Sequence, residues 1–112
     1  MPEDAIARYA RRAATTPRLD ATEAARLAAS AQRGEVPART ALMAAQRRMV
    51  AVVAKQYGLS GCPPEDLLRL GEAGLEQAID RYRDSSGSFS TYATWHIRQA
   101  ITRGLGSPPI AH

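Results

Sequence analysis

Cysteine is almost absent from this sequence: Cys62 is the only one among 112 residues. A single thiol excludes a disulfide framework and a thiolate cluster for zinc, and His96 and His112 lie too far apart in sequence to suggest a metal pair. Long apolar runs are also missing, since the longest, Met49 to Ala54, is far too short to span a bilayer. The N-terminus lacks the basic and then apolar layout of a signal peptide. These absences favour a cytoplasmic protein with no metal, no cofactor and no membrane contact.

Motifs of catalysis are missing as well. The sequence has no glycine-rich phosphate loop, no nucleophile with a placed base, and no pair of carboxylates in an apolar setting. We therefore do not expect an enzyme.

β-Branched residues are few, and no stretch alternates apolar and polar residues, whereas alanine, leucine and arginine dominate. This composition predicts an all-α fold. A chain of this length forms one domain and buries roughly two thirds of its unfolded surface, which suffices for a core without disulfides. We expect a compact bundle of about four to five helices over residues 1–106, followed by a short extended tail over residues 107–112.

Capping signals mark the first two predicted helices. Asp20, with Glu23 three residues later, forms a capping box, and the helix that it opens is expected to close at Gly34. Pro37 suits the first turn of the next helix, which is expected to stop at Gly58.

A third helix is predicted from the Pro63–Pro64 pair to the segment 85–87. Its interior contains Gly71 and Gly74. Each glycine costs about 1 kcal/mol in a helix interior, so their presence indicates the close approach of another backbone.

The net charge of +4 is unevenly distributed. Residues 1–57 carry ten Lys and Arg against five acids, residues 58–84 carry six acids against three Arg, and residues 85–112 carry two Arg and no acid. Such a chain can present one face to nucleic acid and another to a basic protein surface. Charge alone is equally compatible with ordinary solvated helix faces.

The segment FSTYATWHIRQAITR, residues 89–103, holds half of the aromatic side chains of the chain: Phe89, Tyr92 and Trp95. It is expected to form a helix that begins near Ser90 as its N-cap and ends at 104 or 106. At 100° per residue, one arc of this helix is small and apolar and should pack on the core. That arc consists of Ala93, Ile97, Ala100, Ile101 and Gly104.

The opposite side of this helix is aromatic and polar. It carries Thr91, Tyr92, Trp95, Gln99, Thr102 and Arg103, with Arg98 on the flank. In one interpretation, Trp95 and Tyr92 cover a second apolar layer supplied by the N-terminal helices. In the other, aromatic planes stack on unpaired bases, amide and hydroxyl groups read base edges, and arginines bind phosphates. The polar neighbours of Trp95 favour the second interpretation.

The same segment closely resembles the helix with which bacterial sigma factors of the sigma-70 family melt DNA and read the −10 promoter element. Fourteen of its fifteen positions fit the common pattern, and His96 stands where a second Trp is usual. A looser resemblance covers residues 3–103. The resemblance implies that the chain has the fold of sigma factor region 2.

The resemblance also implies roles for individual residues toward promoter DNA. Trp95, with His96 in the second aromatic place, would wedge at the junction between paired and unpaired strands. Tyr92 and Phe89 would support or stack against the flipped adenine of the −10 element. The remaining predicted DNA contacts are Gln99 and Thr102 to the upstream base pair, Arg98 and Arg103 to phosphates, and Thr91 on the same face.

The segment EDLLRLGEAGLEQAIDRY is similar to the helix with which this family grips core RNA polymerase. The implied polymerase-binding positions are Asp66, Arg69, Leu70, Glu72 and Glu76. Asp66 keeps the family residue, whereas Arg69 and Leu70 replace a Gln-Glu pair, Glu72 replaces an Asn, and Glu76 replaces an apolar residue. These departures predict a weakened or altered polymerase interface, with Asp66 and Glu72 as surface acids that meet a basic partner.

Two functions of different class follow. In the first, the chain is a sigma-like, nucleoid-associated initiation factor or activator that binds promoter DNA and directs RNA polymerase, with a separate DNA-binding activator protein supplying upstream contacts. In the second, it is a sigma-like regulatory protein that acts mainly through protein binding, as a polymerase or sigma competitor. Retention of the DNA-reading residues alongside loss of the polymerase-gripping ones favours the first.

Overall fold

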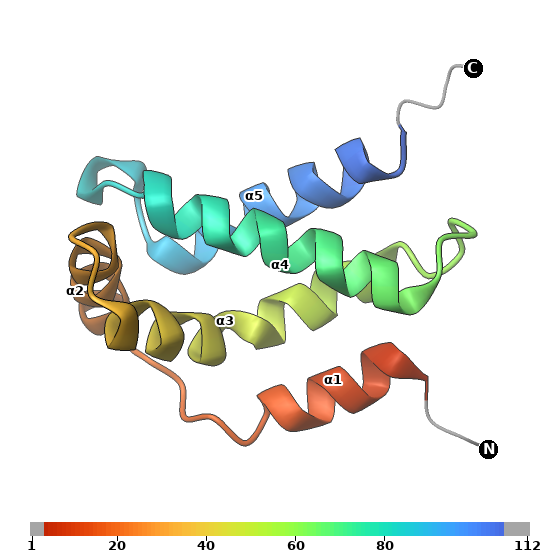
Figure 1. Ribbon diagram of the computed structural model, residues 1–112, viewed down its shortest axis with the longest axis horizontal. Coiled ribbons are helices and arrows are strands. Elements are labelled where there is room, and N and C mark those ends of the chain that lie inside the picture. The colour runs from red at the N-terminus through yellow and green to blue at the C-terminus, as the bar shows by residue number, and fades with distance from the viewer. Residues whose placement is uncertain (1–3, 107–112) are drawn as a thin grey trace.

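The computed structural model describes residues 4–106, which form a bundle of five α-helices and one short 3-10 helix (Figure 1). The elements are α1 (Ala5–Ala13), α2 (Ala21–Gln32), α3 (Val36–Gln56), α4 (Pro64–Arg81), η1 (Asp84–Ser86) and α5 (Phe89–Gly104). No strand occurs in this range, and the predicted all-α class and helix number are confirmed. The predicted tail over 107–112 lies outside the described residues.

The bundle is a flattened slab of 39 by 35 by 21 Å with α3 at its centre. Helix α3 contacts all four other α-helices, and α4 packs most extensively on α5. Figure 1 shows α1 along the lower edge, α5 along the upper edge, and α2 closing the left end. The central position of α3 follows from its length and from buried residues on several sides, including Leu42, Val50 and Val53.

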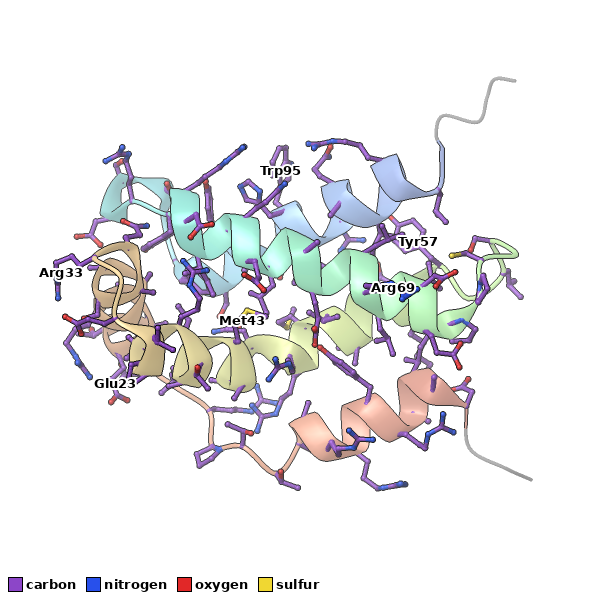
Figure 2. The ribbon with its side chains drawn as sticks, viewed as in Figure 1. Glu23, Arg33, Met43, Tyr57, Arg69 and Trp95 are labelled. Atoms are coloured by element: carbon purple, nitrogen blue, oxygen red, sulfur yellow. The ribbon has the colours of Figure 1, made fainter. Side chains whose placement is uncertain are left out.

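The core is formed by aliphatic side chains of α3, α4 and α5 around one aromatic ring. Its largest fully buried side chains are Leu42, Val50, Val53, Leu67, Leu75, Ile79, Phe89, Ile97 and Ile101. Helix α2 contributes only small buried side chains, Ala24, Ala28, Ser30 and Ala31, so it can lie close against α3 and α4. Met43, labelled in Figure 2, is buried as well.

The predicted N-cap at Asp20 is confirmed, because its carboxylate accepts a hydrogen bond from the Glu23 N–H at 2.8 Å. The prolyl start of α3 is confirmed too. The predicted cap of the last helix is wrong by two residues: Ser88 is the N-cap, and its hydroxyl accepts from the Thr91 N–H at 3.3 Å. Ser90 lies in the first turn, where its hydroxyl exchanges hydrogen bonds with the Gln46 amide.

The close approach predicted at Gly74 is confirmed. A Cβ added there would lie 2.6 Å from the His96 carbonyl oxygen and 2.8 Å from the Ile97 Cα, which is closer than Cβ atoms come to backbone. At Gly71 the nearest atom is a side-chain carbon, Val50 Cγ1, at 2.9 Å. The two glycines allow α5 to lie directly on α4, and this contact fixes which side of α5 faces outward.

Candidate nucleic-acid interface

Helix α5 is held to the bundle by one aliphatic stripe. Ala93, Ile97 and Ile101 have no exposed surface. Because these residues recur every four positions, the opposite side of the helix necessarily faces solvent. Trp95 lies on that side and is 56% exposed, and Figure 2 shows its indole directed away from the bundle.

An unbroken series of aromatic rings connects this indole to the core. The Trp95 and His96 rings meet edge to face, with centroids 5.1 Å apart and an interplanar angle of 82°. The ring centroids of His96 and Tyr92 are 4.6 Å apart, and those of Tyr92 and Tyr82 are 5.6 Å apart. The Tyr82 and Phe89 centroids are 5.3 Å apart. Such tilted and edge-on pairs are the arrangement that aromatic rings prefer. The exposed indole therefore rests on a packed support.

The structure places two of the predicted DNA contacts beneath the surface. Phe89 has no exposed area and His96 is only 6% exposed, so neither ring faces a nucleotide in this conformation. Sequence reasoning placed them outside because it followed the aromatic pattern of the resemblance. Both residues instead follow the helical spacing of the buried face: Phe89 lies four residues before Ala93, and His96 lies three residues after it.

The polar half of the surface is anchored to the end of α3. The Tyr57 and Thr102 hydroxyls share a hydrogen bond of 3.1 Å, and the Arg98 guanidinium donates to the side-chain oxygen of Gln56. Gln99 lies on α5 between Trp95 and Thr102 and is half-buried. Thr91 and Arg103 are exposed. Sequence analysis did not identify Gln56 or Tyr57, since both lie more than 40 residues away along the chain.

Positive charge surrounds the aromatic support. Burial lowers the pKa of His96 below its usual value, and Arg81 and Arg103 lower it further. The lowered pKa favours the neutral imidazole, so the positive charge of this face comes from guanidinium groups, among them Arg98 and Arg103.

The implied polymerase-binding positions on α4 are largely engaged within the chain. Asp66 and Arg69 form an ion pair with each other. Leu70 is half-buried and covers Gly104 of α5, where an added Cβ would lie within 2.5 Å of both Leu70 methyl carbons. Glu76 forms an ion pair with Arg39, in which Oε1 lies 3.6 Å from Nη1.

Glu72 differs most from expectation. Its Oε2 atom accepts hydrogen bonds from the Tyr9 hydroxyl at 2.6 Å and from the Arg47 Nε at 2.9 Å. Burial, followed by the hydrogen bond to Glu72, raises the pKa of Tyr9, so its hydroxyl remains a donor. Glu72 therefore has a basic partner within the chain, Arg47, and its carboxylate joins α1, α3 and α4. Sequence analysis missed Tyr9 and Arg47 because nothing local connects them.

Among residues 4–106, no group of three or more metal-ligating side chains is close enough to hold a metal ion. Within the same range, no helix is both long and apolar enough to cross a membrane.

Comparisons with known proteins extend these observations. Residues 42–107, more than half of the chain, match the family described as Sigma-70 region 2. The RNA polymerase principal sigma factor HrdD of Streptomyces griseus is 51% identical over 59 residues, which are 52% of this chain and 18% of that protein. The RNA polymerase sigma factor SigA of a Bacillus species is 37% identical over 103 residues, which are 91% of this chain and 27% of that protein. The chain thus spans about a fifth to a quarter of the length of these relatives.

Proposed function

Because this chain belongs to the sigma-70 region 2 family, we propose that it acts in transcription initiation and binds opened promoter DNA through the outer face of α5. The observation that carries the proposal is the exposed Trp95 indole on its aromatic support. A flat, preorganised ring at the surface offers a stacking partner to a base that has left the duplex, and each stacked base contributes about 1–3 kcal/mol.

Six residues on the outer side of α5 have proposed roles that fit their positions. Trp95 stacks at the junction of paired and unpaired strands, and Tyr92, half-buried beside His96, supports it. Gln99 and Thr102 offer amide and hydroxyl groups to base edges. Arg98 and Arg103 neutralise phosphates, which position the strand without reading its sequence.

Phe89 and His96 act from beneath in this proposal. Their rings support the stacking surface through Tyr82, Tyr92 and Trp95. A neutral imidazole can pack beneath the indole without burying a charge. The lowered pKa of His96 favours this neutral form.

We further propose that α4 docks on core RNA polymerase through an interface that differs from that of other sigma factors. Asp66, Arg69 and Glu76 remain at its surface, whereas Leu70 and Glu72 are drawn into internal contacts. A separate DNA-binding activator protein would then compensate for the reduced grip by recruiting the complex to promoters.

The second candidate function is regulation by protein binding, with the chain competing for polymerase or for another sigma factor. The bonds of Arg98 to Gln56 and of Thr102 to Tyr57 favour it, because they occupy within the chain two groups that are proposed to contact DNA. The exposed indole argues against it, since a protein competitor has no need of a stacking surface.

The test measures binding to two oligonucleotides that share a −10-like sequence, one fully paired and one with an unpaired bubble. Wild type should prefer the bubble, and Trp95→Ala should weaken bubble binding about tenfold or more while leaving duplex binding nearly unchanged. Val36→Ala is the control, because it truncates another exposed apolar side chain, 70% exposed, at the far end of α3. Equal binding of both DNAs by all three proteins would favour the regulatory function.

A further inference from the structure

A hollow of about 330 Å³ lies among α1, α3 and α4, and no residue of α5 lines it. Its wall consists of Tyr9, Arg12, Ala13, Thr16, Ala44, Arg47 and Glu72. Tyr9, Arg12, Ala13 and Thr16 lie on one side of α1 and the turn after it, because they are three and four residues apart. The hollow therefore borders α4, the helix proposed to dock on polymerase, and is separate from the Trp95 surface.

The hydrogen bonds inside this hollow leave cationic donors unused. The Tyr9 hydroxyl and the Arg47 Nε both donate to the same oxygen, Glu72 Oε2. Glu72 is the only carboxylate paired with Arg47 within residues 4–106, and the Arg12 guanidinium has neither a hydrogen bond nor an ion pair in that range. Two guanidinium groups thus face one carboxylate, which leaves one positive charge uncompensated.

We propose that this hollow receives the carboxylate of an acidic side chain presented by the protein that docks on α4. The proposal rests on the proposed docking of α4 to core polymerase. A planar carboxylate fits the fork of donors that a guanidinium presents, and Arg12 and Arg47 supply two such forks on neighbouring helices. Ala13 and Ala44 make the rest of the wall small and apolar, and the Thr16 hydroxyl adds a further donor.

The charges around the hollow favour a protein over a nucleic acid. Glu72 lies in its wall, and Glu76 and Asp80 follow on the exposed side of α4, sharing Arg39. A phosphate backbone would bring several negative charges past these acids, whereas a single acidic side chain brings one charge to the one uncompensated cation. The single uncompensated cation thus matches one protein carboxylate better than a run of phosphates.

The contact would replace the polar interactions with polymerase that α4 does not offer through Leu70 and Glu72. Glu72 holds the Arg47 guanidinium in place through the Nε bond, and in this proposal the terminal nitrogens of Arg47 bind the incoming carboxylate. Glu72 is accordingly a positioning residue, while Arg12 and Arg47 bind the carboxylate.

The first experiment measures binding of sodium acetate, as the simplest carboxylate, by the amide chemical shifts of Ala13, Thr16 and Ala44. Wild type should show saturable shifts, Arg12→Gln should weaken acetate binding about fivefold or more, and Arg11→Gln should bind as wild type does. Arg11 is a matched control on the same helix that does not line the hollow. Absence of saturable shifts, equal loss in both variants, or tighter binding of inorganic phosphate than of acetate would overturn the carboxylate assignment.

The second experiment measures the affinity of the full chain for purified bacterial core RNA polymerase. Arg12→Glu should weaken binding about tenfold or more relative to Arg11→Glu, with both variants melting at the temperature of wild type. Equal binding by the two variants would overturn the proposed contact while leaving docking itself intact. Failure of wild type to bind core polymerase would instead overturn the docking on which the contact rests.

Discussion

The His96 imidazole and the Trp95 indole meet edge to face, with ring centroids 5.1 Å apart and ring planes at 82°. One ring is 6% exposed and the other 56% exposed, so the pair joins the core to the surface. A charged imidazole beneath the indole would change both the packing and the field at the proposed stacking site. Several consequences of this arrangement can be measured.

The first prediction concerns pH. An unfolded chain binds a proton at His96 near the ordinary pKa of 6.5, while burial, Arg81 and Arg103 hold the folded pKa lower. The unfolded state therefore binds more protons in the window below 6.5, and the free energy of unfolding should fall as pH falls through that window. Urea unfolding at about pH 7.5 and about pH 5.5 measures this change. His96→Gln should show a smaller decrease, and an identical decrease in both proteins would contradict the lowered pKa.

The second prediction concerns Gly74. A methyl group there meets the His96 carbonyl oxygen and the Ile97 Cα, neither of which can rotate away. Gly74→Ala should destabilise the fold by about 1–3 kcal/mol despite the better helix propensity of alanine. Urea unfolding gives the value, with Ala73→Ser on the exposed side of the same turn as the control. A Gly74→Ala protein as stable as wild type would mean that α5 does not lie so close to α4.

The sequence predicted the orientation of α5 because its aliphatic positions repeat every four residues at Ala93, Ile97 and Ile101. It did not predict the short helix α1, whose nine residues contain three arginines and only one large aliphatic side chain, Ile6. A helix of that composition becomes stable through tertiary packing, and its anchor is Glu72, 63 residues from Tyr9.

The two displaced predictions have local causes. Ser88 and Ser90 are equally good capping residues two positions apart, and only the turn after η1 determines which one caps α5. His96 was expected outside because the related pattern has an aromatic wedge there, yet it lies seven residues after Phe89 and three after Ala93, both fully buried, which is the spacing of one helix face. Periodicity was the better guide to burial, and resemblance was the better guide to family.

The third prediction concerns the attachment of α1. Tyr9→Phe removes the hydrogen bond to Glu72 and leaves the Arg47 bond in place, so it should cost about 0.5–1.5 kcal/mol. The loss should appear as faster amide hydrogen exchange in α1 than in α4 or α5. Unchanged exchange in α1 would show that apolar packing, including that of Ile6 and Ala13, holds the helix without this hydrogen bond.

The fourth prediction concerns phosphate contacts. Arg98→Ala should reduce the slope of log affinity against log salt for bubble DNA by about one unit. Arg83→Ala is the matched control, because it removes an exposed arginine from the loop before α5. A slope unchanged by the Arg98 substitution would remove this residue from the proposed interface.

Trp95 is the only tryptophan of the chain, so its fluorescence reports directly on the proposed stacking surface. The most direct test titrates the wild-type protein with bubble DNA and with fully paired DNA of the same −10-like sequence. We predict strong, saturable quenching of the indole by the bubble and little quenching by the paired duplex. Equal quenching by both DNAs, or binding of the bubble with no change in indole emission, would contradict the account.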